Sequence, residues 1–179
     1  MKKKKNCKET ILDAAEDVVV ESGAVHMTLD AVCSKAGVSK GGLLYHFPNK
    51  ESLIDAMLLR LVERFETARS AASEKMRGDP RRNIKAHVTT YLSRDKRMNK
   101  VCAAFVAAAA HNPNLISTAK RSHKKAFEKL VAPDMRWETA AVIALAVDGL
   151  WLTKLLGITP FNAREQKAII DELLKIANE

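Results

Sequence analysis

The sequence predicts an all-α protein of about nine helices. Apolar residues recur at helical spacing along almost the whole of its 179 residues. Only 7 Gly and 5 Pro interrupt the chain, which is too few for a protein built from many short strands and tight turns. The composition, with 47% hydrophobic and 28% charged residues, is that of an ordinary folded protein and excludes collagen-like, disordered and disulfide-scaffold classes.

The first half of the chain divides into four helices at residues that typically start or stop a helix. Thr28, Ser39 and Asn49 are each placed to cap the first turn of a helix, and Gly37 tolerates the positive φ of a tight turn. Pro48 stops the helix before it, because proline restricts the preceding residue to extended backbone. The first predicted helix ends at Ser22-Gly23, and the second spans 29–36. The third runs from Ser39 towards Phe47, and the fourth begins at Asn49.

The second half predicts five further helices, separated by breaks that mostly contain Pro. In chain order they are a helix that follows Gly78-Asp79-Pro80, an alanine-rich helix over 99–110, a basic helix that ends before Pro133-Asp134, a strongly apolar helix over 138–156 and an amphipathic helix over 163–177. The longest apolar stretch covers residues 101–110, which is too short to span a bilayer, so we expect no membrane partner.

The segment 28–50, TLDAVCSKAGVSKGGLLYHFPNK, carries the pattern that points to a function. Two short capped helices joined by a glycine turn, each too short to be stable alone, are typical of a helix-turn-helix. The spacing turns Val38, Leu43 and Phe47 inward and turns outward Lys40, Gly41, Gly42 and Tyr45. A glycine inside a helix costs about 1 kcal/mol. Glycines beside a lysine therefore indicate a partner surface that approaches the backbone, and the DNA major groove is the natural candidate.

The stretch over 11–53 resembles the amino-terminal domain of tetracycline-repressor-type (TetR family) transcriptional regulators. The residues that carry the resemblance are Thr28-Leu29, Ala36-Gly37-Val38-Ser39, Gly41, Leu43, Tyr45-His46-Phe47 and Asn49-Lys50-Glu51-Ser52-Leu53. The resemblance implies an amino-terminal three-helix, helix-turn-helix DNA-binding domain over 1–50. A carboxy-terminal helical ligand-binding and dimerisation domain would then span 51–179. One position departs from the family, because Leu44 stands where a second tyrosine commonly binds the DNA backbone.

The same resemblance implies a set of residues that bind double-stranded operator DNA. They are Thr28, Ser39, Lys40, Gly41, Gly42, Tyr45, His46 and Lys50. Lys40 and Gly41 would face base edges, and the phosphate backbone would be held by Thr28, Tyr45, His46 and Lys50. The same residues also have structural explanations. Thr28 and Ser39 can cap helices, His46 can be a packed neutral imidazole, and Tyr45 can be a core residue with its hydroxyl at the rim.

The last two predicted helices are more apolar than a monomer needs. The helix over 138–156 is apolar on nearly every side, so one side can face its own core and another a second subunit. Two such helices from each subunit would form a four-helix interface, which is the usual arrangement of the family. We therefore expect a homodimer, with candidate interface residues Ile143, Val147, Leu150, Ile169 and Leu173.

A carboxy-terminal domain of about 130 residues is larger than dimerisation alone requires. We expect it to bind a small-molecule effector that releases a repressor from its operator. Tyr91, Phe105 and Trp151 would line an apolar cavity with His111 as a polar anchor, although each also suits an ordinary core position.

The net charge of +9 suits either a polyanionic partner or a solvated basic face. Residues 75–100 carry nine basic and two acidic groups outside the helix-turn-helix, and we favour a solvated face for them. The alternative function from these observations is a ligand-independent helical DNA- or RNA-binding protein.

Other classes of function find little support in the sequence. An enzyme is disfavoured, because the sequence has no Gly-rich phosphate loop or serine-elbow motif, and no metal or other cofactor is expected from five His without metal-ligand spacing. Three unpaired Cys predict a reduced, cytoplasmic protein, with Cys33 as a small core residue rather than a redox sensor.

Overall fold

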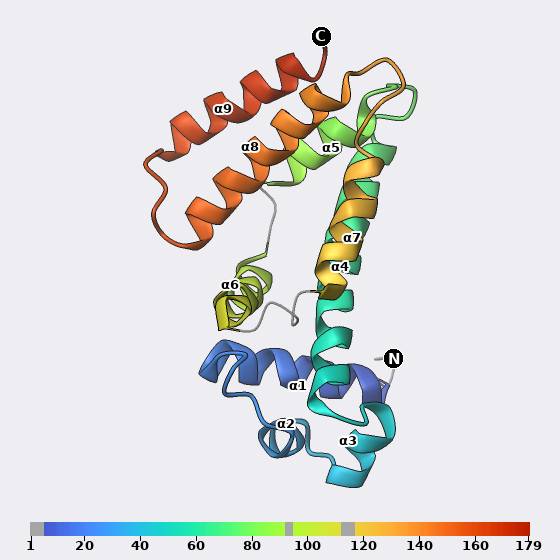
Figure 1. Ribbon diagram of the computed structural model, residues 1–179, viewed down its shortest axis with the longest axis vertical. Helices are drawn as coiled ribbons and strands as arrows, with labels where there is room; N and C mark the ends of the chain where they lie inside the picture. Colours follow the sequence, from blue (N-terminus) through green and yellow to red (C-terminus); the bar gives the residue numbers. More distant parts are fainter. Residues whose placement is uncertain (1–5, 92–94, 112–116) are drawn as a thin grey trace. The chain divides into compact units, whose positions relative to one another are not determined.

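The computed structural model describes residues 6–91, 95–111 and 117–179, and the side chains of all these residues except 111, 118 and 119. These residues form nine helices and no strands, as the sequence predicts. In chain order (Figure 1) the helices are α1 (Cys7–Ser22), α2 (Leu29–Ala36), α3 (Lys40–His46), α4 (Lys50–Glu74), α5 (Arg82–Thr90), α6 (Lys96–His111), α7 (Ser117–Glu128), α8 (Trp137–Leu155) and α9 (Ala163–Ile176). None of the helices described is long and apolar enough to cross a lipid bilayer.

The chain forms two compact units. The first unit, Met1–Val62 with Lys96–Lys120, contains α1, α2, α3, the first half of α4 and α6. The second unit, Glu63–Asp95 with Arg121–Glu179, contains the second half of α4, α5, most of α7, α8 and α9. The chain therefore passes between the units within α4, just before α6 and within α7. The functional division at residue 50 is not tested by these contacts and stays a prediction.

Helix α1 is central to the first unit, because it contacts α2, α3 and α6. Its apolar face, with Ile11, Ala15 and Val19, is fully buried. The core it enters also contains Leu43 of α3, the first half of α4, and the α6 side chains Val101, Phe105 and Ala108. Two helices that are too short to be stable alone are thus held by a core that includes a helix from much later in the chain.

The second unit is built around α8, which contacts both α5 and α9. Its core contains Ile84 and Val88 of α5, together with the inward faces of α8 and α9. Helix α9 begins with a capping box, in which the Asn162 side chain accepts the N–H of Glu165 and the Glu165 carboxylate accepts the N–H of Asn162.

Candidate nucleic-acid interface

The turn between α2 and α3 has the local geometry that its sequence dictates. The Thr28 hydroxyl accepts the N–H of Ala31 at 3.2 Å, and the Ser39 hydroxyl accepts the N–H of Gly42 at 3.1 Å. Gly37 ends α2 with φ of 65°, in the left-handed region that favours glycine. Capping is therefore confirmed for both hydroxyls. It uses an oxygen lone pair and leaves the hydroxyl hydrogen as a donor for a phosphate.

Helix α3 has one face in the core and one face in solvent. Leu43 is 0% exposed and Phe47 is 2% exposed, whereas Tyr45 is 85% exposed. Lys40 and Gly41 are also exposed, so the inward and outward sides of α3 are those the sequence predicts. The core position considered for Tyr45 is wrong, because its ring stands in solvent. A large aromatic side chain in that position costs hydrophobic free energy unless a partner covers it.

The two lysines of the predicted interface are held differently. Lys40 Nζ lies 3.0 Å from an Asp30 carboxylate oxygen on α2, and both side chains are more than half exposed. Lys50 Nζ donates to the carbonyl of Val25 at 3.1 Å, which ties the start of α4 to the loop that precedes α2. An exposed ion pair contributes only about 0–1 kcal/mol, so Lys40 can exchange Asp30 for another partner at little cost.

His46 is half-buried between two aromatic rings. Its imidazole meets the ring of Tyr45 edge-on, with 5.1 Å between centroids, and lies 6.4 Å from the ring of Phe47. The packed position considered from the sequence is thus partly correct. His46 joins the exposed Tyr45 to the buried Phe47.

The two glycines of α3 differ in what surrounds them. A Cβ added at Gly41 would meet no atom within 4 Å, whereas one at Gly42 would lie 3.3 Å from the Ser39 hydroxyl oxygen. Space inside the protein therefore does not require glycine at position 41. Glycine at position 41 leaves this part of the solvent side of α3 without a side chain.

Two family models match the chain and together cover most of it. The model described as "Bacterial regulatory proteins, tetR family" matches residues 11–57, which contain the helix-turn-helix. The model described as "Tetracyclin repressor-like, C-terminal domain" matches residues 81–178, more than half of the chain. The chain belongs to the TetR family of bacterial transcriptional regulators, which carry an amino-terminal DNA-binding helix-turn-helix and a helical carboxy-terminal domain.

Individual relatives agree with this assignment. The HTH-type transcriptional regulator BetI of Stenotrophomonas maltophilia is 26% identical over 173 residues, which cover 90% of this chain and 88% of BetI. A transcriptional regulator from Rhodococcus sp. Rha1, solved by crystallography, is 25% identical with a TM-score of 0.74, and the match covers 95% of each chain. The multidrug binding protein EbrR, solved in complex with imidazole, has the same fold with a TM-score of 0.72 at 24% identity, over 94% of this chain and 88% of EbrR.

Two of the four residues predicted to line an effector pocket share one core, that of the second unit. Tyr91 is buried in the core of the second unit, where its hydroxyl donates to the carbonyl of Leu150 at 3.1 Å, and Trp151 packs against the same core. Phe105 is 2% exposed in the core of the first unit, and its role in a pocket stays a prediction. The side chain of His111 lies outside the described residues. Helical spacing predicted that these residues lie on the apolar faces of their helices, but it did not predict which core each one enters.

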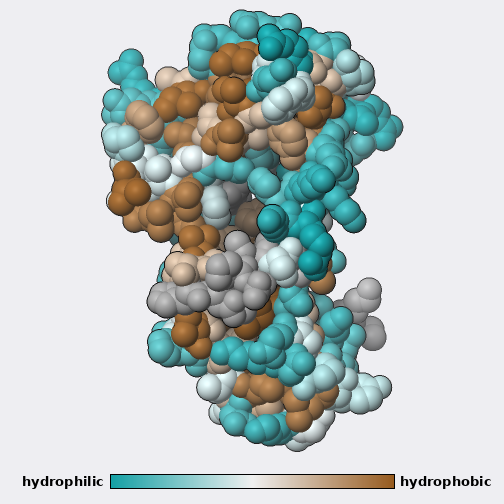
Figure 2. All heavy atoms as spheres, in the orientation of Figure 1, coloured by the Kyte–Doolittle hydropathy of each residue, from teal (hydrophilic) through white to brown (hydrophobic). Residues whose placement is uncertain are grey.

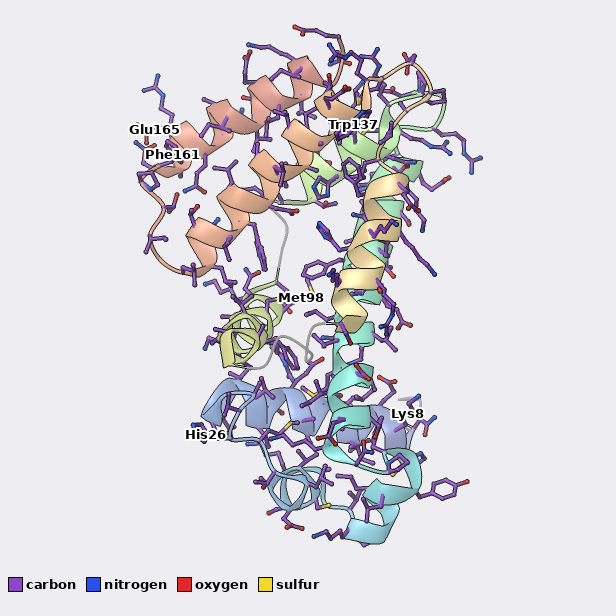
Figure 3. All side chains as sticks on the ribbon, in the orientation of Figure 1. Lys8, His26, Met98, Trp137, Phe161 and Glu165 are labelled. Carbon is purple, nitrogen blue, oxygen red and sulfur yellow. The ribbon has the colours of Figure 1, made fainter. Side chains whose placement is uncertain are left out.

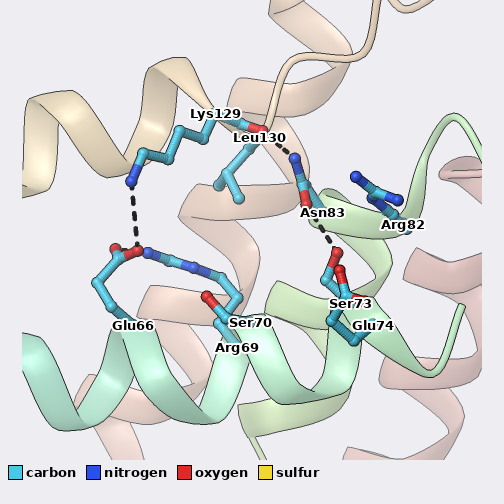
Figure 4. Close-up of a pocket in the computed structure, with 9 residues that line it drawn as sticks. All are labelled: Glu66, Arg69, Ser70, Ser73, Glu74, Arg82, Asn83, Lys129 and Leu130. Carbon is cyan, nitrogen blue, oxygen red and sulfur yellow. Dashed lines mark hydrogen bonds and ion pairs between the residues drawn. The ribbon is translucent and has the colours of Figure 1, made fainter. Parts of the chain in front are cut away.

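The second unit contains a polar cleft that the sequence did not predict. It lies between the second half of α4, the start of α5 and the end of α7 (Figure 4), and its lining residues are Glu66, Arg69, Ser70, Ser73, Glu74, Arg82, Asn83, Lys129 and Leu130. Leu130 is the single apolar residue among them, in contrast to the apolar cavity expected. The lining residues come from helices that are distant in the sequence. The sequence shows only that those of α4 recur at helical spacing, and not that they meet residues of α5 and α7.

Hydrogen bonds and ion pairs organise most of this cleft. The Glu66 carboxylate pairs with Arg69 and lies 3.7 Å from Lys129 Nζ. The Asn83 side chain accepts from the Ser73 hydroxyl at 2.9 Å and donates to the carbonyl of Lys129 at 3.0 Å. Burial lowers the pKa of the Arg69 guanidinium, and the charge of Asp148 on α8 opposes this shift. These partners hold Glu66, Arg69, Ser73, Asn83 and Lys129 in place.

Most of the predicted dimer residues are buried within their own chain. Ile143 and Val147 are 0% exposed, and Leu150 and Leu173 are each 5% exposed, so all four lie in the core of their own chain. Ile169 is half-buried and packs against the same core. A helix that is apolar on every side does not reveal which side turns inward, and the prediction chose the inner one.

Other apolar side chains of the second unit remain exposed. On α8 they are Val142, Leu145 and Leu152, which are 60%, 71% and 38% exposed and share one side of the helix. The loop after α8 adds Leu156, Ile158 and Phe161. Figure 2 shows apolar side chains gathered over α8 and this loop, and Figure 3 shows Phe161 in the loop before α9. An exposed patch of this kind indicates a surface that a partner covers.

Proposed function

We propose that this regulator binds double-stranded operator DNA as a homodimer, with α3 in the major groove, and that a small molecule bound in the second unit releases it as a repressor. One observation carries the DNA proposal. Leu43 and Phe47 hold α3 in the core, while Lys40, Gly41 and Tyr45 occupy its solvent face. A reading helix needs this combination of fixed orientation and an uncovered polar face.

The roles of the individual residues follow from their present partners. We assign Lys40 to a guanine edge, because its exposed pair with Asp30 is easily exchanged. Gly41 and Gly42 keep the start of α3 free of side chains, so that its backbone can approach the bases. The phosphate contacts are assigned to Thr28, Ser39, Tyr45, His46 and Lys50, which fix the register of the helix on the duplex.

The proposed dimer uses the outer side of α8. Val142, Leu145 and Leu152 recur at helical spacing on that side, and the exposed Gly149 between them allows a second helix to approach closely. A twofold dimer presents two copies of α3, which requires an operator with two inverted half-sites about one helical turn or a multiple of it apart.

The proposed effector binds in the second unit, and the polar cleft is its candidate site. The side chains of Arg82 and Ser70 line the cleft without a hydrogen bond or ion pair among the described residues, so they can bind a ligand. The surrounding charges favour a polar or charged molecule over an apolar one. EbrR, which has this fold, has been solved with imidazole, ethidium and malachite green.

The DNA proposal is tested by selecting duplexes from a random library with the full-length protein. We expect a palindromic consensus. On that duplex, Lys40→Ala should weaken binding by about 1–3 kcal/mol and relax the preference at one base pair. Lys50→Ala should weaken all sequences alike and lower the salt slope by about one unit. If both variants lose affinity equally on scrambled DNA, the division into base and phosphate contacts is wrong.

The effector proposal is tested by a thermal-shift screen of small polar and charged metabolites, followed by operator titrations with each compound that stabilises the protein. A compound that stabilises the protein and weakens operator binding supports the proposed switch, and linkage requires the operator to weaken the compound's binding by the same factor. If no compound alters DNA binding, the protein is a ligand-independent DNA-binding protein. The proposed role of the chain is regulation rather than catalysis. We expect it to act in the bacterial cytoplasm, where its DNA lies.

A further inference from the structure

One buried carboxylate on α1 binds arginines from two other helices of the first unit. The Glu16 side chain is 2% exposed. Its Oε1 accepts from Arg60 Nε of α4 at 3.0 Å, and its Oε2 lies 3.5 Å from Arg97 Nε of α6. Burial alone would lower the pKa of Arg60, but Glu16 and Asp13 outweigh burial and raise this pKa. A buried carboxylate is tolerated only when it is paired, so Glu16 holds α4 and α6 against α1.

Three further acids of α1 lie on the same side of the helix, at a spacing of four residues: Glu9, Asp13 and Asp17. Arg60 Nη1 donates to Asp13 Oδ1 at 2.9 Å and to Glu9 Oε2 at 3.2 Å. Arg97 Nη2 lies 3.0 Å from Asp17 Oδ1 and donates to the Asp13 carbonyl at 3.0 Å. Two guanidiniums thus neutralise part of an acidic stripe. Removing one of them leaves crowded like charges on α1.

Both arginines lie close to a point where the chain passes between the two units. Arg60 precedes the passage after Val62, and Arg97 follows the passage before Lys96. Helix α1, to which both arginines are bound, contacts α2 and α3 directly, so the cluster holds the helix against which the reading helices pack.

We propose that Glu16, Arg60 and Arg97 form an anchor that fixes α1, and with it the DNA-reading helices α2 and α3, in the orientation that operator binding needs. The inference rests on the proposed DNA-binding function. All three are positioning residues, because they act through α1 rather than by touching DNA. When Arg97 is removed, Glu16 and Asp17 lose one of their cationic partners, α1 is held less firmly against α6, and the orientation of α3 is less well fixed.

The anchor is tested first without DNA, by amide hydrogen exchange on the full-length protein. Arg97→Gln is compared with Lys100→Gln, which removes the same charge from the same helix at an exposed residue with no ion pair in the described part of the chain. We expect exchange in α1 and the first turns of α6 to become about fivefold faster or more in R97Q, and to change less than about twofold in K100Q. Arg97→Lys, which keeps the charge, should restore most of the protection.

The positioning role is then tested on the operator duplex selected as described above. R97Q should bind it about 3–10-fold more weakly than the wild type, and K100Q within about twofold of it. In a Glu16→Gln background the effect of R97Q should shrink, because the two residues act through one contact.

Equal behaviour of R97Q and K100Q in both measurements overturns the anchor. Faster exchange in R97Q with unchanged operator affinity, or additive effects with E16Q, overturns its positioning role. If the protein selects no duplex at all, the proposed function fails, while the exchange experiment still decides whether the anchor exists.

Discussion

Replacing Gly41 by alanine separates what α3 needs for folding from what it needs for binding. Gly41 has a helical backbone without positive φ, and an added Cβ would meet no atom within 4 Å. Alanine in a helix is favoured over glycine by about 0.5–1 kcal/mol. The substitution should therefore stabilise the isolated protein, with a rise in Tm of about 1–4 °C for a chain of this size.

The same methyl group should weaken operator binding. If the backbone of α3 approaches the base edges at Gly41, the added Cβ displaces the helix from the groove and disturbs the contact of the neighbouring Lys40. A good base contact is worth about 1–3 kcal/mol, so we expect a loss of about 5–150-fold in operator affinity. Stability and affinity are thus expected to move in opposite directions, which a general folding defect does not produce.

Thermal unfolding and operator titration of Gly41→Ala test both halves of this expectation. Thr67→Ala is the matched control, because Thr67 is an exposed residue of α4 whose hydroxyl donates to the Glu63 carbonyl one turn earlier, and alanine there also raises helix propensity. The control should gain stability and keep wild-type affinity. The reasoning is refuted if Gly41→Ala binds the operator as tightly as the wild type, because α3 would then not approach DNA at this residue.

Three further predictions concern the dimer, acid stability and the autonomy of the DNA-reading segment. Leu145→Asp, at an exposed residue of α8, should yield a folded monomer in sedimentation, whereas Leu150→Asp, in the core, should unfold the chain. Hydrogen bonds from Lys85 and the N–H of Arg81 lower the pKa of Asp79. The contribution of the ionised Asp79 to stability is therefore complete above about pH 4 and is lost as pH falls through the lowered pKa. In denaturant titrations, Asp79→Asn should reduce the free energy of unfolding by about 0.5–1 kcal/mol at pH 7 and by much less at pH 3. A fragment over 1–62 should not fold cooperatively by circular dichroism.

The boundaries of the helix-turn-helix were predictable because its signals are local. Thr28, Gly37 and Ser39 act within three or four residues of themselves, and each has the role that its residue type predicts. The two sides of α3 were predictable for the same reason, since Leu43 and Phe47 lie four positions apart and mark a single apolar side of this short helix. Local chemistry therefore determined most of the candidate interface.

The orientation of α8 was not predictable, because its sequence is apolar on every side. Ile143 and Val142 are adjacent and equally apolar, yet one is 0% and the other 60% exposed. Only the positions of α5 and α9 decide which of them enters the core. The polar cleft escaped prediction for a related reason, because Arg69, Arg82 and Lys129 come together only through the tertiary fold.

The acidic stripe of α1 was visible in the sequence, but its burial was not. Glu16 would be placed in solvent by residue type alone, since a carboxylate is rarely buried without a partner. Its partners Arg60 and Arg97 lie 44 and 81 positions later in the chain, so no local pattern connects them. A buried charge at the junction of three helices is the kind of feature that only the tertiary structure reveals.

The expected failure of the 1–62 fragment follows from the core that α6 completes. Val101 and Phe105 are 1% and 2% exposed within the first unit, and burying side chains of this size contributes about 1.5–3 kcal/mol each. Their loss removes about 3–6 kcal/mol from a total that rarely exceeds about 15 kcal/mol, and it exposes the apolar side of α1 as well. Helices α2 and α3, with 8 and 7 residues, have no stability of their own to offset this. If the fragment nevertheless unfolds cooperatively with a midpoint near that of the full chain, α6 does not hold the reading helices in place. If it does not fold, the DNA reader depends for its structure on a helix that the family model assigns to the carboxy-terminal domain, and any movement of that helix must alter the reader.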